Sequence, residues 1–246
     1  MWLHDRDRNV ATRARVETRV GQGILDPAWS PGDSLIAYRT AFGGGPLALR
    51  VYHVRTGASD SLFASGRRNV RTPDWSPDGR RIAFQLSAGD SASNDEIWVY
   101  SFAERRASPA WAGAGNLANP RWSPDGRWLA YVSDETGAAE VYVRPMSGPG
   151  VAVRVSTAGG EIPRWRADGR ELYYRAPDGA IMAVGVRSDA AIALSSPRVA
   201  VARPPFSRTV RTFDVTPDGG QFVAFGREDP PVFTLVLDWA ARLSAR

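Results

Sequence analysis

The chain has 246 residues, a formal net charge of +5 and a sequence pI near 10.0, and it contains no cysteine. This length can bury a full hydrophobic core, as one large all-β domain or two small domains, without disulfide bonds. Lysine is absent, so all 31 basic residues are arginines, and they are scattered among Asp and Glu. Because a phosphate-binding surface needs clustered positive charge, the composition argues against a nucleic-acid partner.

The first 19 residues are rich in Asp and Arg and lack the apolar core of a signal peptide. No run of eighteen apolar residues occurs anywhere, so we expect no transmembrane segment in this chain. The alternating letters of residues 1–20 instead predict two short strands.

A seven-residue motif recurs along the rest of the sequence. It reads "PAWSPGD" from Pro27, "PDWSPDG" from Pro73 and "PRWSPDG" from Pro120, with weaker copies "PRWRADG" from Pro163 and "FDVTPDG" from Phe213. The third position is Trp29, Trp75, Trp122, Trp165 and then Val215, at intervals of 46, 47, 43 and 50 residues. A period in the forties with strand-like content is typical of the four-stranded blade of a β-propeller.

The third copy shows the strand pattern of one blade. A short first strand over 120–122 is followed by a Ser-Pro-Asp-Gly turn, in which Pro presets φ and Gly accepts a positive φ. Apolar and alternating stretches then predict strands over 127–133, 140–146 and 151–156. Tight turns between consecutive strands make the sheet antiparallel.

We therefore predict an all-β propeller of four-stranded antiparallel blades in a single domain over 1–246. Residues 1–20 would supply the third and fourth strands of a partial first blade, and the last blade would lack its fourth strand. Two closures stay open: a five-bladed ring completed by the N-terminal strands, or a six-bladed parent, which we favour. The predicted full blades cover 27–65, 73–112, 120–156 and 163–203, and the partial last blade covers 213–239.

The motif itself is structural in this interpretation. Ser-Pro-Asp-Gly forms the hairpin between the first and second strands, so its Asp is a turn former and not a catalyst. The Trp before each turn is a large apolar plate suited to packing between neighbouring blades.

These residues resemble the TolB-type propeller repeat, whose signature is Trp-Ser-Pro-Asp-Gly followed by an apolar strand. The resemblance covers nearly the whole chain and weakens at Arg166-Ala167, where Ser-Pro is lost, and at Val215, where Trp is lost. The first copy reads Gly32-Asp33 in place of Asp-Gly, which predicts a different turn in detail.

A narrower resemblance lies near the C-terminal end. "GAIMAVGV" from Gly179, "FDVTPDGGQFVAF" from Phe213 and "PPVFTLVLDWAARL" from Pro230 look like the tail of propellers attached to bacterial receptor-like Ser/Thr kinases. That resemblance implies a fragment of a membrane-anchored kinase whose propeller lies in the periplasm or outside the cell. The kinase motifs themselves are missing from this sequence, which would leave only the sensor or scaffold portion.

The sequence offers no catalytic set, so we expect no enzyme activity and no cofactor. Prolyl-oligopeptidase-type enzymes carry similar propellers, but they need a Gly-x-Ser-x-Gly elbow and a triad His, and this chain has no such elbow and only His4 and His53. The alternative that stays open is the accessory propeller of such a peptidase without its catalytic domain. A metal-dependent propeller enzyme such as a lactonase would need ligands that only Asp26, Asn119 and Glu161 offer.

Propellers bind partners where the loops entering the first strands converge at the mouth of the channel. The residues just before Pro-x-Trp should line that mouth, with neighbouring charges. Their mixed sign suits a protein or peptide partner better than a phosphate backbone. The predicted binding residues are Asp26, Arg71, Thr72, Asn119, Glu161 and Arg211, with Ile162 and Thr212 at the equivalent positions.

Overall fold

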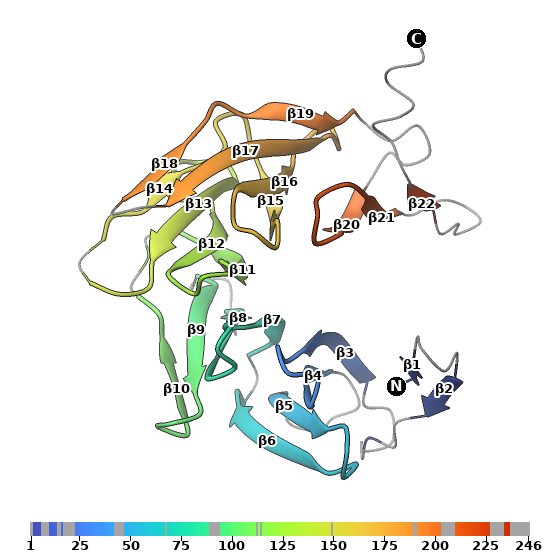
Figure 1. Cartoon of the computed structure of the whole chain (residues 1–246). Coiled ribbons are helices and arrows are strands. Elements are labelled where there is room, and N and C mark those ends of the chain that lie inside the picture. Colours follow the sequence, from blue (N-terminus) through green and yellow to red (C-terminus); the bar gives the residue numbers. More distant parts are fainter. Residues whose placement is uncertain are drawn as a thin grey trace. The chain divides into compact units, whose positions relative to one another are not determined.

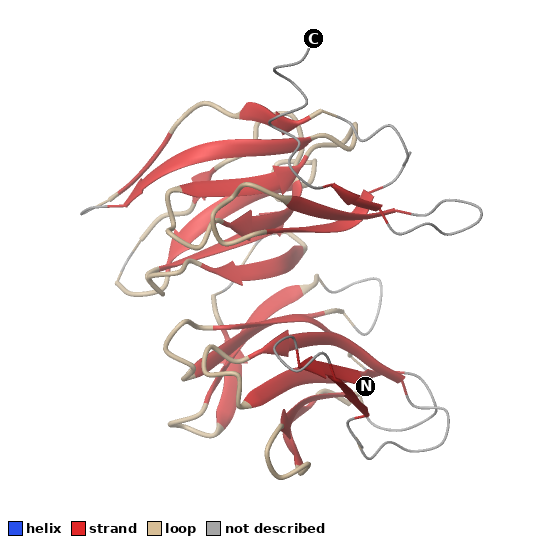
Figure 2. Ribbon diagram, turned by 45° about the vertical axis from the view of Figure 1, so that its right-hand side comes forward, coloured by secondary structure: helices blue, strands red, loops and turns tan. Residues whose placement is uncertain are grey.

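A computed structural model gives the fold. It describes residues 2–5, 10–13, 16, 23–41, 47–66, 68–88, 94–111, 113, 115–148, 150–188, 191–202, 210–226 and 234–236. Every regular element in these ranges is a β-strand (Figure 2). Within the described residues, no helix has the length and apolarity that crossing a membrane requires.

The chain divides into two compact units, residues 1–120 (unit 1) and 121–246 (unit 2), which are described separately. Unit 1 begins with a two-stranded ribbon and continues with two four-stranded antiparallel sheets in the order β3-β4-β5-β6 and β10-β9-β8-β7 (Figure 1). Its strands are β1 (Trp2–Asp5), β2 (Val10–Arg13), β3 (Gly23–Trp29), β4 (Leu35–Ala41), β5 (Ala48–His53), β6 (Ser59–Ala64), β7 (Val70–Trp75), β8 (Arg81–Leu86), β9 (Glu96–Ser101) and β10 (Arg106–Pro109).

Unit 2 contains a four-stranded, a five-stranded and a three-stranded sheet, and the unit boundary falls inside β11 (Figure 1). Its strands are β11 (Leu117–Trp122), β12 (Trp128–Ser133), β13 (Glu140–Pro145), β14 (Val153–Arg154), β15 (Glu161–Trp165), β16 (Glu171–Arg175), β17 (Ile181–Ser188), β18 (Ile192–Leu194), β19 (Arg198–Val201), β20 (Val210–Val215), β21 (Phe222–Gly226) and β22 (Thr234–Val236).

The predicted all-β fold of four-stranded antiparallel blades is confirmed. In the third copy the strands occupy Leu117–Trp122, Trp128–Ser133, Glu140–Pro145 and Val153–Arg154, close to the stretches expected from the sequence. The fourth copy differs, because its outer strand is split: β18 and β19 both pair with β17 at different heights. The number of blades in the closed ring stays a prediction.

The Ser-Pro-Asp-Gly motif forms the expected hairpin turn. In the second copy the Ser76 hydroxyl donates to Asp78 Oδ1 at 2.5 Å, and Asp78 Oδ1 also accepts the Arg80 amide at 3.0 Å. Gly79 has a φ of 68°, which a side chain would disfavour. In the first copy Asp33 takes that place with a φ of 53°, so the altered order shifts the left-handed residue from Gly to Asp.

The motif tryptophan joins consecutive blades. The Trp75 indole N–H donates to the Ala28 carbonyl of the first sheet at 3.1 Å, and the Trp165 N–H donates to the Arg121 carbonyl at 3.2 Å. Both acceptors directly precede the tryptophan of the preceding blade. Trp75 is 7% exposed and Trp29 is 49% exposed, so the same residue type is buried in one copy and half-exposed in another.

Each unit has a core between its sheets. In unit 1 the core between the first two sheets includes Leu49, Ile82 and Phe84, all fully buried. In unit 2 the core between the fourth and fifth sheets includes Phe213 and Phe222, both 2% exposed. The second strands β8 and β12 are buried along almost their whole length, and their sequences "RIAFQL" and "WLAYVS" are mostly apolar.

Candidate functional site

The residue before the motif proline adopts an unusual backbone in four first strands. Asp26, Thr72, Asn119 and Ile162 have φ values of 52°, 47°, 52° and 55°. A positive φ is uncommon for residues other than glycine and is a marked outlier for β-branched Thr and Ile. Such strain costs roughly 1–3 kcal/mol per residue and concentrates at functional sites.

The strain coincides with a break in strand pairing. The register of β3 with β4 shifts between Leu25 and Ala28, and that of β7 with β8 shifts between Arg71 and Asp74. β15 shows the same shift between Glu161 and Arg164. A bulge of this kind re-aims side chains and is over-represented next to binding and active sites.

In unit 1 the bulges bring two predicted site residues together. The Asp26 carboxylate accepts the Arg39 Nε–H at 2.7 Å and the Thr72 backbone N–H at 3.3 Å. Arg39 comes from β4 and is 16% exposed, whereas the Asp26 side chain is 37% exposed. The carboxylate is therefore fixed in direction by the protein and still open to solvent on one side.

The other predicted site residues of unit 1 lie on its first strands. Arg71 is exposed on β7, opposite Gln85 of β8. Asn119 is half-buried at the left-handed position of β11. Arg71 adds an exposed positive charge next to Thr72 in the sequence, so these first strands carry side chains of both signs.

In unit 2 Glu161 pairs with Arg175, the residue opposite it on β16. Ile162 is 9% exposed and belongs to the core, so it does not contribute a binding side chain. Arg164 lies within 3.6 Å of Asp214 and about 5.9 Å from the centre of the Phe213 ring. This first strand therefore takes part in two acid–arginine pairs, Glu161 with Arg175 and Arg164 with Asp214.

Arg211 lies in β20, but its side chain is outside the described residues. Thr212, the equivalent of the left-handed residues, is exposed, and the register of β20 with β21 also shifts between Val210 and Thr212. The fifth copy thus keeps the bulge.

Sequence reasoning missed the second strands as a source of site residues. Arg39 and Arg175 each hold an acidic residue of the preceding strand. The signal was available in the repeat: "AYR" at 37–39 and "YYR" at 173–175 end their apolar runs with an arginine at the same position.

The described residues contain no group of three or more His, Cys, Asp or Glu side chains that could hold a metal ion. The Asp26 carboxylate, held by Arg39 and the Thr72 amide, has the chemistry to accept further hydrogen bonds, and the exposed Arg71 on the neighbouring first strand can donate them.

The sequence matches the TolB beta propeller domain family over residues 5–207. No curated protein sequence is detectably similar to the chain. A match over this share of the chain establishes the family, in agreement with the repeats and their blades.

Solved structures support the same fold. TolB from Acinetobacter baumannii is 21% identical with a TM-score of 0.68, over 92% of this chain and 54% of that one. An oligogalacturonate lyase from Vibrio parahaemolyticus is 11% identical with a TM-score of 0.70, over 97% of this chain and 68% of that one. Prolyl oligopeptidase B from Galerina marginata is 15% identical with a TM-score of 0.56, over 83% of this chain and 32% of that one. At these identities the likeness concerns the fold alone, and the chain spans about half the length of the Acinetobacter TolB.

Proposed function

The chain belongs to the TolB beta propeller domain family, and from that premise we propose that it is a non-catalytic module that binds a protein or peptide segment. The binding surface would lie where the first strands bulge before the motif proline. The narrower assignment, the sensor or scaffold portion of a signalling or envelope protein, is part of this proposal.

One observation carries the proposal: the strained, left-handed residue recurs at the same place in four first strands. A hairpin strand needs no such residue, and each costs stability. In unit 1 the strain turns Asp26 so that Arg39 and the Thr72 amide hold its carboxylate. A pre-oriented acceptor lowers the entropy that a partner loses on binding.

The expected ligand is a polypeptide that offers N–H or cationic donors to Asp26 and an acceptor to Arg71. Both side chains keep open surface, and they carry opposite charges within one sheet pair. Opposite charges at fixed positions set the direction in which a segment binds.

The alternative, the accessory propeller of a serine peptidase, draws on the likeness to prolyl oligopeptidase. The narrower resemblance to kinase-attached propellers draws on sequence near the C-terminus, where residues 227–233 and 237–246 lie outside the described ranges. Both stay predictions, and both are compatible with recognition at the first strands.

The proposal is tested by selecting peptides from a displayed random library against the immobilised chain. Synthetic copies of the selected peptides are then titrated by fluorescence polarisation. Asp26→Asn keeps the shape but removes the charge, so we expect affinity to fall roughly 10- to 100-fold, the loss of one charge-assisted hydrogen bond. Arg71→Gln should weaken binding by a smaller factor.

Asp33→Asn is the matched control, because Asp33 is an exposed aspartate at the turn joining β3 and β4. It should leave peptide affinity unchanged. Recovery of no binding peptide, or equal affinity in the Asp26→Asn, Arg71→Gln and Asp33→Asn variants, would refute recognition at this surface.

A further inference from the structure

The outer edge of the fourth sheet is interrupted at one residue. β18 pairs with the end of β17 at Val186, and β19 pairs with its beginning at Ala183. Between them Gly185 faces Ser195: the Gly185 N–H donates to Ser195 Oγ at 2.8 Å, and the Ser195 N–H donates to the Gly185 carbonyl at 2.9 Å. A glycine inside a strand commonly marks such a close approach.

A hollow of about 280 Å³ lies at this interruption. Three of its lining residues are small, because Gly185 has no side chain and Ala193 and Ser195 have short ones. Two others are arginines, one before β16 and one on β17. The lining residues are Arg170, Gly185, Val186, Arg187, Ala193, Leu194 and Ser195.

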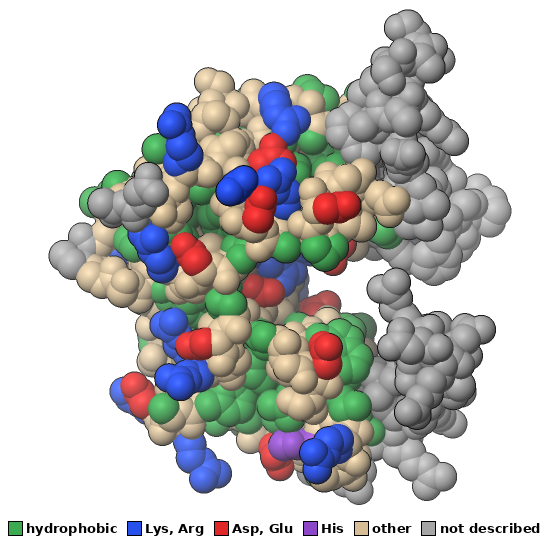
Figure 3. Space-filling view, in the orientation of Figure 1, with side chains coloured by type: hydrophobic (Ala, Val, Ile, Leu, Met, Phe, Trp, Pro, Cys, Tyr) green, Lys and Arg blue, Asp and Glu red, His purple; other side chains and the backbone are tan. Residues whose placement is uncertain are grey.

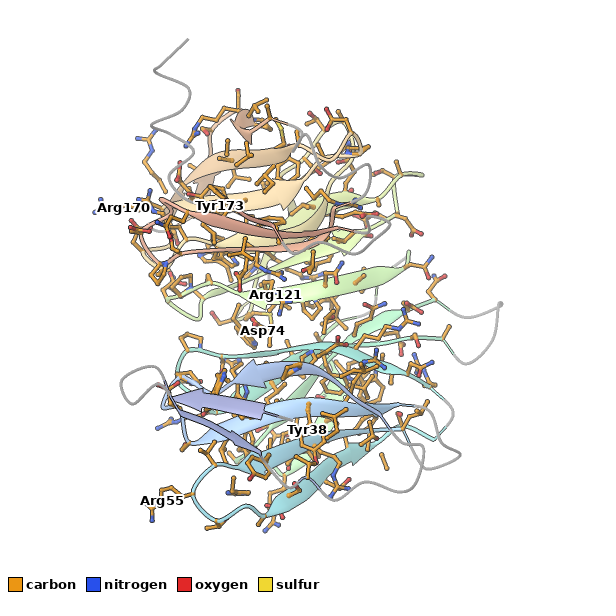
Figure 4. All side chains as sticks on the ribbon, turned by 90° about the vertical axis from the view of Figure 1, so that its right-hand side faces the viewer. Tyr38, Arg55, Asp74, Arg121, Arg170 and Tyr173 are labelled. Atoms are coloured by element: carbon orange, nitrogen blue, oxygen red, sulfur yellow. The ribbon has the colours of Figure 1, made fainter. Side chains whose placement is uncertain are left out.

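A backbone hydrogen bond brings the two arginine residues near each other. The Arg170 carbonyl accepts the Val186 N–H at 2.8 Å, which fixes the Arg170 backbone beside the residue that precedes Arg187. Both arginine residues are exposed, and Figure 4 places Arg170 at the edge of its unit. Among the described residues no acidic side chain forms an ion pair with either guanidinium.

The acidic residues near the hollow are already occupied. Asp168, whose carboxylate accepts the Arg170 backbone N–H at 2.9 Å, is bound by the Arg166 guanidinium. Glu171 is bound by Arg166 and Arg198. On the face drawn in Figure 3, blue and red side chains are interspersed. Two arginines at one hollow with no ion-paired acid among the described residues depart from that pattern.

We propose that this hollow binds an oxyanion, a phosphate or carboxylate group, between the Arg170 and Arg187 side chains. Guanidinium groups match both anions because they donate parallel N–H bonds in one plane. The hollow is smaller than typical small-molecule pockets, so a single charged group fits better than a large ligand. None of the residues lining this hollow belongs to the first strands, so the oxyanion site does not depend on peptide binding there.

The test is a titration of the ¹⁵N-labelled chain with inorganic phosphate and, separately, with acetate, at constant ionic strength. We expect the Arg170 and Arg187 Nε–H signals and the Gly185 amide signal to shift and saturate together. Arg170→Gln and Arg187→Gln should each weaken binding roughly threefold to tenfold, and the double variant should abolish it. Saturation by acetate alone would assign the site to carboxylates, and saturation by phosphate would assign it to phosphoryl groups.

Two further variants distinguish binding in the hollow from a general effect of positive charge. Arg55→Gln removes an exposed arginine of unit 1, also labelled in Figure 4, and should leave the affinity unchanged. Ala193→Leu keeps both arginines but puts a larger side chain in the lining of the hollow, and it should weaken binding severalfold. Shifts that grow linearly with both anions, or that fall equally in the Arg55→Gln variant, would mean nonspecific ion screening and would overturn the proposal.

Discussion

The third and fourth blades along the chain, β11–β14 and β15–β19, build the same turn from different side chains. In the third blade the Gly126 N–H donates to the Ser123 carbonyl at 2.9 Å. In the fourth the Gly169 N–H donates to the Arg166 carbonyl at the same distance, although Arg-Ala has replaced Ser-Pro. The backbone of the turn is therefore retained without the two residues that made the motif conspicuous.

Different side-chain contacts support that shared backbone. Ser123 Oγ donates to Asp125 at 2.5 Å and accepts the Trp128 N–H at 2.9 Å. In the fourth blade Arg166 Nε donates to Asp168 at 2.7 Å, and another guanidinium nitrogen donates to Glu171 at 3.1 Å. Asp and Gly are the shared part of the turn, and an ion-pair network substitutes for the hydroxyl.

The blades also differ where their third strands begin. Glu140 of the third blade is 2% exposed and accepts hydrogen bonds from Arg154, Ser156 and the Gly159 N–H. The fourth blade has Ala180 at the equivalent place, 5% exposed. The third blade thus ties its outer strand with a buried charge, whereas the fourth blade has a buried, uncharged side chain at this place.

Removing the buried charge should have the largest effect. Glu140→Ala leaves three donors without their acceptor, and we expect the free energy of unfolding to fall by about 2–3 kcal/mol. The value lies at the low end for a buried pair because the Arg154 side chain is 39% exposed and can be solvated. Urea unfolding followed by tryptophan fluorescence measures the change.

Glu135→Ala is the matched control, because Glu135 is exposed in the preceding loop. It should change stability by less than about 0.5 kcal/mol. Equal losses in the two variants would show that the buried network does not stabilise the third blade.

The next largest difference between the third and fourth blades should be in how their stability depends on pH. Burial raises the pKa of Glu140, but the hydrogen bonds from Ser156, the Gly159 amide and Arg154 outweigh it and lower the pKa below 4.5. The hydrogen bond from Arg166 lowers the pKa of Asp168 from 3.8 to about 2. A carboxyl group whose pKa is lower in the folded than in the unfolded chain stabilises the fold at any pH above its unfolded pKa. This stabilisation is lost as the pH falls from the unfolded pKa through the folded pKa.

We therefore expect the Glu140 contribution to decline as soon as pH drops below 4.5, and the Asp168 contribution to decline between 3.8 and about 2. Glu140→Gln should flatten the curve of unfolding free energy against pH just below 4.5. Asp168→Asn should flatten only the more acidic part. If both variants keep the wild-type slope, neither carboxylate governs acid unfolding.

The repeats made the fold predictable, because turn residues and apolar strands carry local signals. The exposure of Trp29 could not be predicted from the repeat, because the tryptophan at the same motif position in the second copy, Trp75, is buried. The positive φ of Thr72 and Ile162 could not be predicted either, because β-branched residues rarely adopt it. Position in the repeat predicts the candidate site residues, whereas their partners, such as Arg39 on Asp26, depend on strand register.

The smallest expected effect comes from exchanging the first residue of the fourth turn, Arg166, for the serine that the third turn has at that position. Arg166→Ser would restore the hydroxyl of the motif, which can donate to Asp168 as Ser123 donates to Asp125. Glu171 would keep Arg198 and the Tyr173 hydroxyl as partners, so we expect a change within about 0.5 kcal/mol. Ser123→Ala, which removes a hydroxyl with nothing in its place, should cost about 1 kcal/mol by the same urea measurement. If Arg166→Ser lowers the free energy of unfolding more than Ser123→Ala does, the fourth turn depends on its guanidinium. The side chains of the two turns are then not interchangeable.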